Sequence, residues 1–397
     1  MQNLDLVILA GGKGTRIKKF TNGKPKPLVK INKTPFISYL LNHYSKFNFN
    51  KIYILAGYKG YLLKKKYHNK IVNTCKIKVI IERTPMDTGG ALFPLKKLIN
   101  NDFVLVNGDS ILKLSKLQYF KYNYMFLTRN LKYKKNSKLN GINIGKENNL
   151  RIDIRSKLMN AGVYYLKSNF LNNIKNKKIS IETELLPGLI KEKKIKGIFS
   201  GQFFLDIGTP NNFINAPKLL KNNFYRPAVF LDRDGVINYD KGYTYKYDKF
   251  KFKPHVIKAL KFLVRKNYYI FIVTNQAGIA KGYYTESAFL KLHKKINSYL
   301  AKYKIYIDDL QYCPYHIKAK IKKYKKNSKF RKPGNLMILD LLKKWHVDKS
   351  KSFMIGDKNS DLIAAKKSKI YFEFDKDNLY KQSSLIISKF KSKNKIK

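Results

Sequence analysis

Two carboxylates stand two residues apart, at Asp232 and Asp234, directly after a short apolar run. Residues i and i+2 of an extended chain point to the same side, so both carboxylates converge beside Gly235. One carboxylate can attack phosphorus to form an aspartyl-phosphate, and the other can protonate the leaving alkoxide and then activate water. Mg²⁺ would make such a pair compatible with an anionic substrate. The same spacing also fits a solvated turn, so further motifs must decide between the two interpretations.

Three later motifs carry complementary chemistry at the ends of apolar runs. Thr274 and Asn275 offer a hydroxyl and an amide to a phosphate, and Arg331 and Lys332 precede Pro333 as fixed cations. The stretch GDKNSD (356–361) supplies one carboxylate for a metal and a second acid. These motifs, in this order, favour phosphoryl chemistry over a plain turn.

In this order the four motifs resemble those of the HAD phosphatase superfamily. The likeness runs from about residue 228 to 375 and is greatest to the heptose 1,7-bisphosphate phosphatases and the related histidinol-phosphatases, through DRDGVIN, VTNQAGIAKGYYTE, YCPYH, RKPG and GDKNSD. The resemblance implies a nucleophile at Asp232, a general acid/base at Asp234 and phosphate contacts at Thr274 and Lys332. It also implies Mg²⁺ at Asp232, Asp234 and Asp357, and substrate contacts at Asn275, Lys281 and Arg331.

The chain departs from these relatives at one loop. Relatives often bind a structural zinc with a C-x-H pair followed by C-x-C, whereas this chain reads Cys313-Pro314-Tyr315-His316 and lacks the later cysteines. Four zinc ligands cannot be assembled from one Cys and one displaced His. We therefore expect no zinc.

The first half of the chain opens with a different phosphate motif. LAGGKGTR (9–16) follows an apolar run, and its glycines let successive backbone N–H groups approach an anion. Lys13 and Arg16 add charge that can neutralise a triphosphate. The motif is not a Walker A loop, because no GK[ST] closes it. An ordinary tight turn is the alternative.

Downstream residues add a lysine and two carboxylates. Lys26 lies between Pro25 and Pro27, on a stiff stretch of backbone. Asp109 and Asp206 each follow an apolar run, which places Asp109 at the carboxyl edge of a sheet, where open α/β folds bind ligands. Two such carboxylates could hold one Mg²⁺ across a nucleoside triphosphate.

Together these residues resemble the sugar-1-phosphate nucleotidylyltransferases over about residues 4–215, and within that family the heptose 1-phosphate guanylyltransferases most closely. Matching pieces include LAGGKGTR, KPKPLV, TGGA, NGD, NAGVY and DIGTP. The resemblance implies nucleotide contacts at Gly11, Gly12, Gly14 and Thr15, phosphate contacts at Arg16 and Lys26, and Mg²⁺ at Asp109 and Asp206. It also implies sugar contacts near Glu82, Gly90, Asn160 and Gly162 and a role for Glu182. The family usually has an EKP-like lysine shortly before NAG, where this chain reads IDIRSKLMNAG. Arg155 or Lys157 could take its place, but the spacing is shorter, so that role stays unassigned.

The elements that position these motifs alternate between apolar runs and amphipathic stretches. This alternation predicts two α/β domains, each a doubly wound, mostly parallel sheet, with a Rossmann-like nucleotidyltransferase fold first and a HAD-like fold second. We expect domains at 1–222 and 226–376, separated near Pro227, and a basic tail at 377–397. Expected strands are 4–10, 51–57, 77–82, 102–109 and 162–166, then 228–232, 268–275, 306–313, 352–357 and 369–374.

Composition narrows the classes of protein. The formal net charge is +58, but the lysines are spread along the chain, and no nucleic-acid-binding motif is visible. We interpret the charge as background composition that also attracts anionic substrates. Two cysteines, no apolar run of membrane-spanning length and no basic leader predict a cytoplasmic protein without membrane or nucleic-acid partners. The sequence leaves open whether the protein forms a homo-oligomer.

The sequence therefore predicts a Mg²⁺-dependent bifunctional enzyme acting on small molecules. One half would remove the 7-phosphate of heptose 1,7-bisphosphate, and the other would join the 1-phosphate to a nucleotide, with GTP expected as the donor. An alternative keeps both chemistries but pairs a mannose 1-phosphate nucleotidyltransferase with a histidinol-phosphatase-like domain. A non-enzymatic alternative is a basic nucleic-acid-binding protein with vestigial domains.

Overall fold

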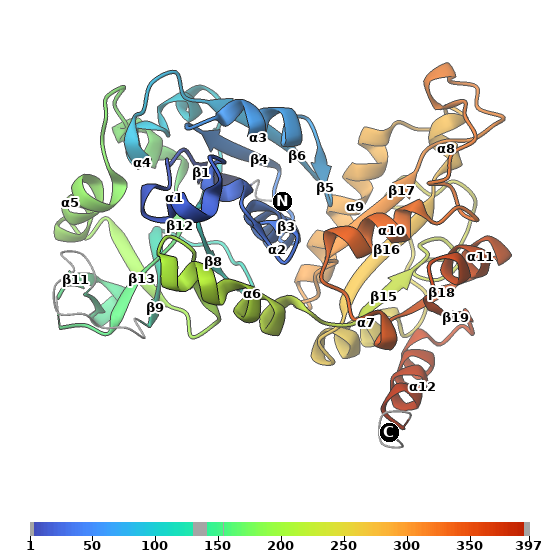
Figure 1. The fold of residues 1–397 in the computed structure, drawn as a ribbon. Coiled ribbons are helices and arrows are strands. Elements are labelled where there is room, and N and C mark those ends of the chain that lie inside the picture. Colours follow the sequence, from blue (N-terminus) through green and yellow to red (C-terminus); the bar gives the residue numbers. More distant parts are fainter. Residues whose placement is uncertain (1–3, 130–140, 154, 393–397) are drawn as a thin grey trace. The chain divides into compact units, whose positions relative to one another are not determined.

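The computed structural model describes residues 4–129, 141–153 and 155–392. The chain divides into two units, of which the first comprises Met1–Tyr44 and Phe49–Asn223 and the second Ser45–Asn48 and Phe224–Lys397. Each unit has its own β-sheet (Figure 1). No described helix has the length and apolar content needed to cross a membrane.

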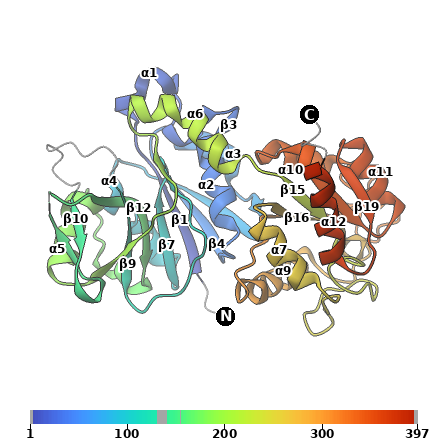
Figure 2. The ribbon, with the colours of Figure 1, turned by 90° about the horizontal axis from the view of Figure 1, so that it is seen from below.

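The first unit is built on an eight-stranded mixed sheet in the order β13-β9-β12-β7-β1-β4-β6-β5. Figure 2 shows β9, β12, β7, β1 and β4 following one another in that order. Strand β1 pairs in parallel with β4 and β7, whereas β12 runs antiparallel to β7 and β9. The strands are β1 (Leu4–Ala10), β4 (Lys51–Ala56), β5 (Ile71–Val72), β6 (Cys75–Ile81), β7 (Asp102–Asn107), β9 (Asn123–Arg129), β12 (Leu158–Leu166) and β13 (Ile195–Phe199).

Helices and three small sheets surround this sheet. The central strands are apolar at nearly every position, which is typical of a sheet covered on both faces. The helices are α1 (Lys18–Thr21), α2 (Phe36–Ser45), α3 (Gly60–Tyr67), α4 (Asp87–Gly90), α5 (Leu186–Lys191) and α6 (Pro210–Phe224). The small sheets pair β2 (Lys30–Ile31) with β3 (Thr34–Pro35), β8 (Ser110–Leu112) with β14 (Phe204–Asp206), and β10 (Ile142–Ile144) with β11 (Leu150–Ile152).

The second unit, yellow to red in Figure 1, has a five-stranded parallel sheet in the order β17-β16-β15-β18-β19. The strands are β15 (Ala228–Leu231), β16 (Tyr269–Asn275), β17 (Asp309–Cys313), β18 (Phe353–Gly356) and β19 (Tyr371–Phe374). One core cluster joins the sheet to α7 (Val256–Arg265), α9 (Glu286–Ala301) and α12 (Leu379–Ser392). Another joins it to α10 (Leu336–Lys344) and α11 (Asn359–Lys367), while the short α8 (Ala277–Ala280) follows β16. The expected α/β fold class is confirmed.

The expected basic tail is wrong for most of its length. Residues Leu379–Ser392 form helix α12, and Leu379, Ile386 and Ile387 are buried against the core of the second unit. These apolar residues recur at helical spacing, which gives the helix one buried face despite its lysines. The last five residues lie outside the described part of the chain.

Candidate active sites

The glycine turn after β1 borders a cavity of about 700 Å³ in the first unit. Gly14 has φ +66°, a left-handed conformation that disfavours other residues. Of the expected nucleotide contacts, Gly11 and Gly12 line the cavity, whereas Gly14 and Thr15 do not. Four cations surround the cavity, namely Lys13, Arg16, Lys26 and Lys178. The last of these comes from a loop that sequence reasoning did not single out.

Lys26 and Asp109 form an ion pair at the edge of this cavity. Lys26 is 7% exposed, and its Nζ lies 2.7 Å from Oδ2 of Asp109. Asp206 ends β14, directly opposite Ser110 in the β8–β14 pair, which brings the two expected metal carboxylates to neighbouring strands. Burial raises the pKa of Asp206, and the negative charge of Asp109 raises it further. Such a pair of carboxylates fits a hard divalent cation.

A second cavity of about 310 Å³ adjoins the first, because Arg16, Asn107, Asp109 and Glu182 line both. Asn160 and Gly162 line the second cavity. Gly162 has φ +66°, and a Cβ there would lie 2.8 Å from Nδ2 of Asn107, so a side chain would disrupt the wall between the cavities.

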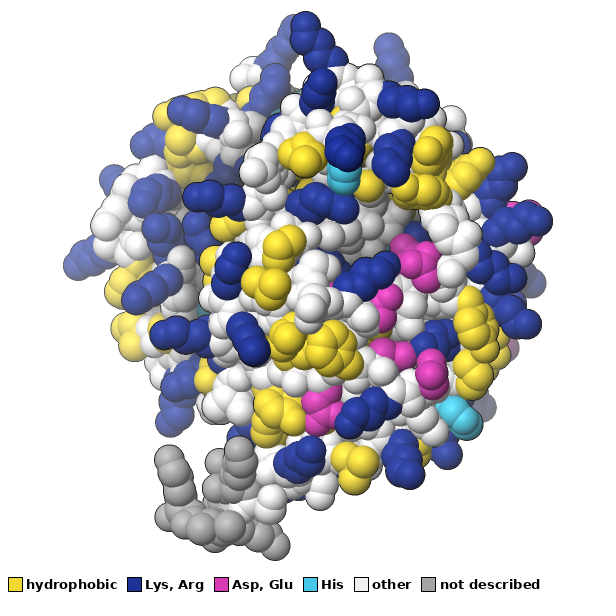
Figure 3. All heavy atoms as spheres, turned by 90° about the vertical axis from the view of Figure 1, so that its right-hand side faces the viewer, with side chains coloured by type: hydrophobic (Ala, Val, Ile, Leu, Met, Phe, Trp, Pro, Cys, Tyr) yellow, Lys and Arg dark blue, Asp and Glu magenta, His cyan; other side chains and the backbone are white. Residues whose placement is uncertain are grey.

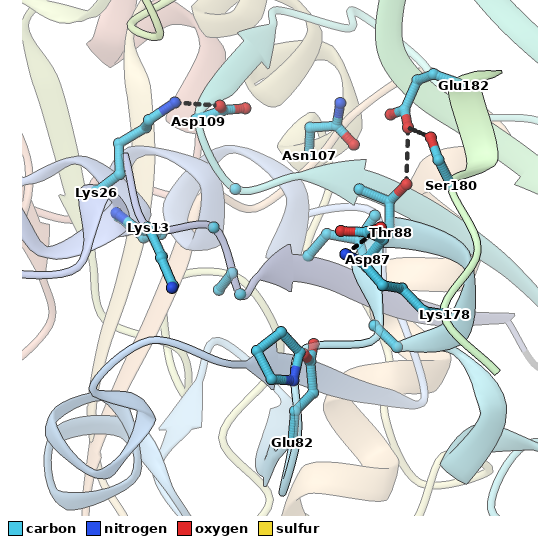
Figure 4. Close-up of a pocket in the computed structure, with 18 of the residues that line it drawn as sticks. Lys13, Lys26, Glu82, Asp87, Thr88, Asn107, Asp109, Lys178, Ser180 and Glu182 are labelled. Atoms are coloured by element: carbon cyan, nitrogen blue, oxygen red, sulfur yellow. Dashed lines mark hydrogen bonds and ion pairs between the residues drawn. The ribbon is translucent and has the colours of Figure 1, made fainter. Parts of the chain in front are cut away.

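The other residues that the resemblance assigns to the sugar do not lie together in the structure. In Figure 4, Lys26 and Asp109 lie across the first cavity from Glu182, which accepts a hydrogen bond of 2.7 Å from Thr88 Oγ1. Glu82 lines only the first cavity, beside the glycine turn. Gly90 lines neither: a Cβ there would meet the Lys177 carbonyl at 2.4 Å, so it allows close backbone packing. Neither Arg155 nor Lys157 is among the described residues that line the two cavities.

In the second unit, Lys332 connects two of the acidic residues. Its Nζ lies 2.9 Å from Oδ1 of Asp232 and 2.5 Å from Oδ1 of Asp361, and it donates to the Val273 carbonyl at 2.8 Å. Asn275 holds the backbone of Lys332 through two hydrogen bonds of 3.0 Å, which gives this residue a role in placing the lysine. Asp232 and Asn275 stand at the carboxyl ends of β15 and β16, whereas Lys332 comes from the loop before α10 and Asp361 from the first turn of α11.

Burial and the neighbouring charges together set the ionisation of this cluster. Asp232 is 6% exposed, and desolvation raises its pKa to about 7, although Lys332 acts in the opposite direction. For Lys332, burial works to lower the pKa, but the charges of Asp232 and Asp361 outweigh it and the pKa rises. The lysine therefore stays charged beside the expected nucleophile.

Three carboxylates of this cluster fit a metal ion. Ligand atoms of Asp232, Asp357 and Asp361 all lie within 4.8 Å of one another. Oδ1 of Asp357 is buried and has no hydrogen-bond partner among the described residues, as expected of an atom that faces a cation. Sequence reasoning noted Asp361 only as a second acid, yet it belongs to this group, whereas the carboxylate of Asp234 does not.

The expected substrate contacts Lys281 and Arg331 differ in exposure. Lys281 is at the surface, where its Nζ donates to Tyr243 Oη at 2.6 Å. Arg331 is half-buried, and burial lowers the pKa of its guanidinium. Figure 3 shows the second unit with acidic side chains gathered near the middle of the face and Lys and Arg side chains around them. The Lys and Arg side chains would attract anionic molecules to this face.

The loop after β17 is held by aromatic and carboxylate contacts. Tyr324 is 6% exposed and packs near Tyr315, and its Oη donates to Glu286 at 2.5 Å. Cys313 is buried, and Nδ1 of His316 accepts a hydrogen bond from the Lys318 backbone. Within the described residues, the one candidate metal group contains neither Cys nor His. The absence of zinc stays a prediction.

The folds and sites define a nucleotidyltransferase followed by a HAD-type phosphatase. Residues 6–223 match the nucleotidyl transferase family, and residues 231–382 match a phosphatase family described as polynucleotide kinase 3 phosphatase. The chain belongs to the nucleotidyl transferase family through its first unit and to the D-glycero-beta-D-manno-heptose-1,7-bisphosphate 7-phosphatase family through its second. Both expected resemblances are confirmed.

Curated relatives of the second unit carry that phosphatase name. The chain is 41% identical to the Rhodopseudomonas palustris protein over 155 residues, which is 39% of this chain and 86% of the relative. It is 39% identical to the Escherichia coli K12 protein over 139 residues, which is 35% of this chain and 73% of the relative. Among solved structures, HddC from Yersinia pseudotuberculosis is 26% identical with a TM-score of 0.43, covering 54% of this chain and 98% of HddC.

Proposed function

We propose that this chain carries out two consecutive steps on one sugar. The second unit would remove the 7-phosphate of D-glycero-D-manno-heptose 1,7-bisphosphate, and the first would join the resulting 1-phosphate to a nucleotide. The observation that carries the proposal is the union, in one chain, of a nucleotidyl transferase with a relative of the heptose bisphosphate 7-phosphatases. The fusion is economical because the product of one half is then the substrate of the other.

For the phosphatase step, Asp232 is the proposed nucleophile. One of its oxygens forms a bond to the 7-phosphorus while the bond to the sugar oxygen breaks, and Asp234 gives a proton to that oxygen. Asp234 then takes a proton from water as the water attacks phosphorus and the aspartyl bond breaks. Lys332 and Thr274 would hold the phosphoryl oxygens. Mg²⁺ at Asp232, Asp357 and Asp361 would neutralise charge during both displacements.

For the transfer step, no covalent intermediate is required. An oxygen of the sugar 1-phosphate attacks the α-phosphorus of the nucleotide, and the bond to pyrophosphate breaks. We propose that the glycine turn, Arg16 and Lys26 hold the triphosphate in the first cavity and that Asn160 and Gly162 receive the sugar in the second. Mg²⁺ at Asp109 and Asp206 would neutralise the reacting phosphates.

Glu82 supports GTP as the nucleotide. Its carboxylate lies in the first cavity, and no Lys or Arg of the described residues forms an ion pair with it, although the chain has 83 such residues. A half-buried carboxylate gains from adjacent N–H donors. Guanine is the common base that offers two adjacent donors, N1–H and N2–H₂, on one edge, so we propose that Glu82 accepts from guanine. This replaces the expected sugar contact at Glu82.

The alternatives are a different sugar and a different class of protein. A mannose-type transferase joined to a histidinol-phosphatase-like domain would keep both sites but reject heptose. A nucleic-acid-binding protein would show binding that weakens steeply with salt and would tolerate Asp232→Asn. The buried Asp232–Lys332–Asp361 cluster favours a working phosphatase.

The deciding experiment measures phosphate and pyrophosphate separately. The full chain with Mg²⁺ is incubated with heptose 1,7-bisphosphate and each nucleoside triphosphate in turn. We expect phosphate with every nucleotide and pyrophosphate above all with GTP. Asp232→Asn should abolish phosphate release and leave pyrophosphate release from heptose 1-phosphate intact. Release of neither ion with any nucleotide would contradict the heptose proposal.

A further inference from the structure

Arg233, between the two motif aspartates, is a cation enclosed in the protein core. Its side chain is 0% exposed, and its guanidinium lies 5.4 Å from the centre of the Phe289 ring. Nη2 donates to the Thr244 carbonyl at 2.8 Å. Burying a guanidinium is costly unless an anion compensates its charge. Arg233 therefore requires an anion close to its guanidinium.

The anion that compensates Arg233 is the carboxylate of Asp234. Nε lies 3.1 Å from Oδ1 and Nη2 lies 2.6 Å from Oδ2, a two-pronged arrangement that fixes the plane of the carboxylate. No other Asp or Glu of the described residues forms an ion pair with Arg233. His293, packed on Phe289, is a neutral neighbour, because burial and then the charge of Arg233 lower its pKa well below the usual value.

Two amides complete the setting of Asp234. Nδ2 of Asn238 donates to Oδ1 and Nε2 of Gln276 donates to Oδ2, both at 3.0 Å. The orientation of Gln276 is itself fixed, since its Oε1 accepts from Tyr284 Oη at 2.6 Å and its Nε2 also lies 2.9 Å from Thr274 Oγ1. Both oxygens of Asp234 are thus held by charged and neutral donors together.

We propose that Arg233 is a positioning residue that aims the carboxylate of Asp234 at the sugar oxygen of the scissile bond. The inference rests on the phosphatase half of the proposed function. A general acid works only when its proton lies within hydrogen-bond reach of the leaving oxygen, so the orientation of the carboxylate controls the rate. Lysine cannot replace the two-pronged contact, because it carries a single point charge.

The test compares Arg233→Lys with Arg226→Lys. Arg226 is a matched control in the same unit: it donates to Asp308 at 3.0 Å and stacks 3.7 Å from the centre of the Tyr269 ring, and no step is assigned to it. We expect Arg233→Lys to lower kcat for heptose 1,7-bisphosphate on the order of 100-fold with a nearly unchanged KM. Arg226→Lys should retain kcat, even where both variants unfold earlier by the fluorescence of Trp345, the single tryptophan.

The leaving group separates positioning from a merely structural role. An alkoxide needs a proton to depart, whereas nitrophenolate does not, so Arg233→Lys should lose far less activity on p-nitrophenyl phosphate than on the sugar ester. Equal losses on both esters, or a kcat no lower than that of Arg226→Lys, would overturn the inference. If the wild-type chain cleaves only the sugar ester, the kinetics of Arg233→Lys on that ester decide: the inference requires a lower kcat with a nearly unchanged KM. If it cleaves neither ester, the proposed function fails instead.

A second variant covers misfolding of Arg233→Lys. Asn238→Leu keeps the approximate shape of a buried side chain and removes the Nδ2 donor that Asp234 Oδ1 shares with the Tyr239 carbonyl. We expect a loss in kcat of about 10-fold on the sugar ester, with the same sparing of the aryl ester. An equal loss on the two esters would count against the inference here as well.

Discussion

The Nζ atom of Lys26 lies 2.7 Å from Oδ2 of Asp109, although 83 positions separate the two residues along the chain. Lys26 stands between two prolines, and Asp109 follows the strand that pairs with β1. The pair therefore joins the phosphate side of the nucleotide cavity to the proposed metal side. A lysine so placed can exchange its carboxylate partner for a phosphate when the nucleotide binds.

We expect Lys26→Met to lower pyrophosphate release on the order of 100-fold, because it removes the buried cation that is proposed to hold the triphosphate. Phosphate release from the bisphosphate should not change, since that site belongs to the other unit. Steady-state assays of both ions measure the two effects. Lys24→Met, at an exposed position of the same segment, is the control and should retain both rates. Normal pyrophosphate release by Lys26→Met would contradict the assignment.

Glu82→Gln should alter the choice of nucleotide. Glutamine offers one acceptor and one donor, so it loses an acceptor for guanine but matches the N3–H and a carbonyl of uracil. We expect kcat/KM for GTP to fall about 10- to 100-fold and the preference for UTP over GTP to rise. Asp87→Asn, in the same cavity, should leave the preference unchanged. An unaltered ratio of UTP to GTP in Glu82→Gln would remove Glu82 from base selection.

Gly235→Ala should disable the phosphatase selectively. Gly235 has φ +92°, and a Cβ there would lie 2.4 Å from Oδ2 of Asp357, a proposed metal ligand. We expect phosphate release to fall on the order of 100-fold while pyrophosphate release continues. Gly242→Ala is the matched control: its φ is +71°, but nothing lies within 4 Å of the added Cβ. That variant should lose roughly 1–2 kcal/mol of stability and keep its phosphatase rate.

His293 should make the second unit less stable in acid. Burial holds its pKa well below 6.5 in the folded state, so the unfolded chain binds a proton that the folded chain excludes. Stability from this group is present above the unfolded pKa and is lost as the pH falls below it, by at most about 1.4 kcal/mol per pH unit. Denaturant unfolding followed by Trp345 fluorescence between pH 7 and 5 measures this slope.

His293→Phe should flatten that dependence on pH, since the phenyl ring takes no proton. His255→Asn serves as the control, because this residue is exposed and asparagine tolerates its φ of +62°. Its slope should match that of the wild-type chain. The explanation fails if His293→Phe and the wild-type chain lose stability equally in acid.

The sequence by itself determined the central strands that carry the motifs, although β9 and β13 of the first sheet were not expected. Short apolar runs of four to seven residues, bounded by turn residues, are typical of buried strands, and β1, β15 and β16 lie where these runs predicted them. Because parallel strands meet at one edge, Asp232, Thr274 and Asp357 had to gather whatever their distance along the chain. Local pattern and strand direction were sufficient for this part of the site.

Only the tertiary structure decided which side chains face one another. The pairing of β7 with β1 brings Asp109 to Lys26, and the first turn of α11 returns Asp361 to the Asp232–Lys332 pair. The tertiary structure also shows that Gly90 lies outside the sugar cavity and that α12 packs against the core. Contacts of this kind depend on strand order and helix docking, which are set by long-range packing and are absent from any local pattern of residues.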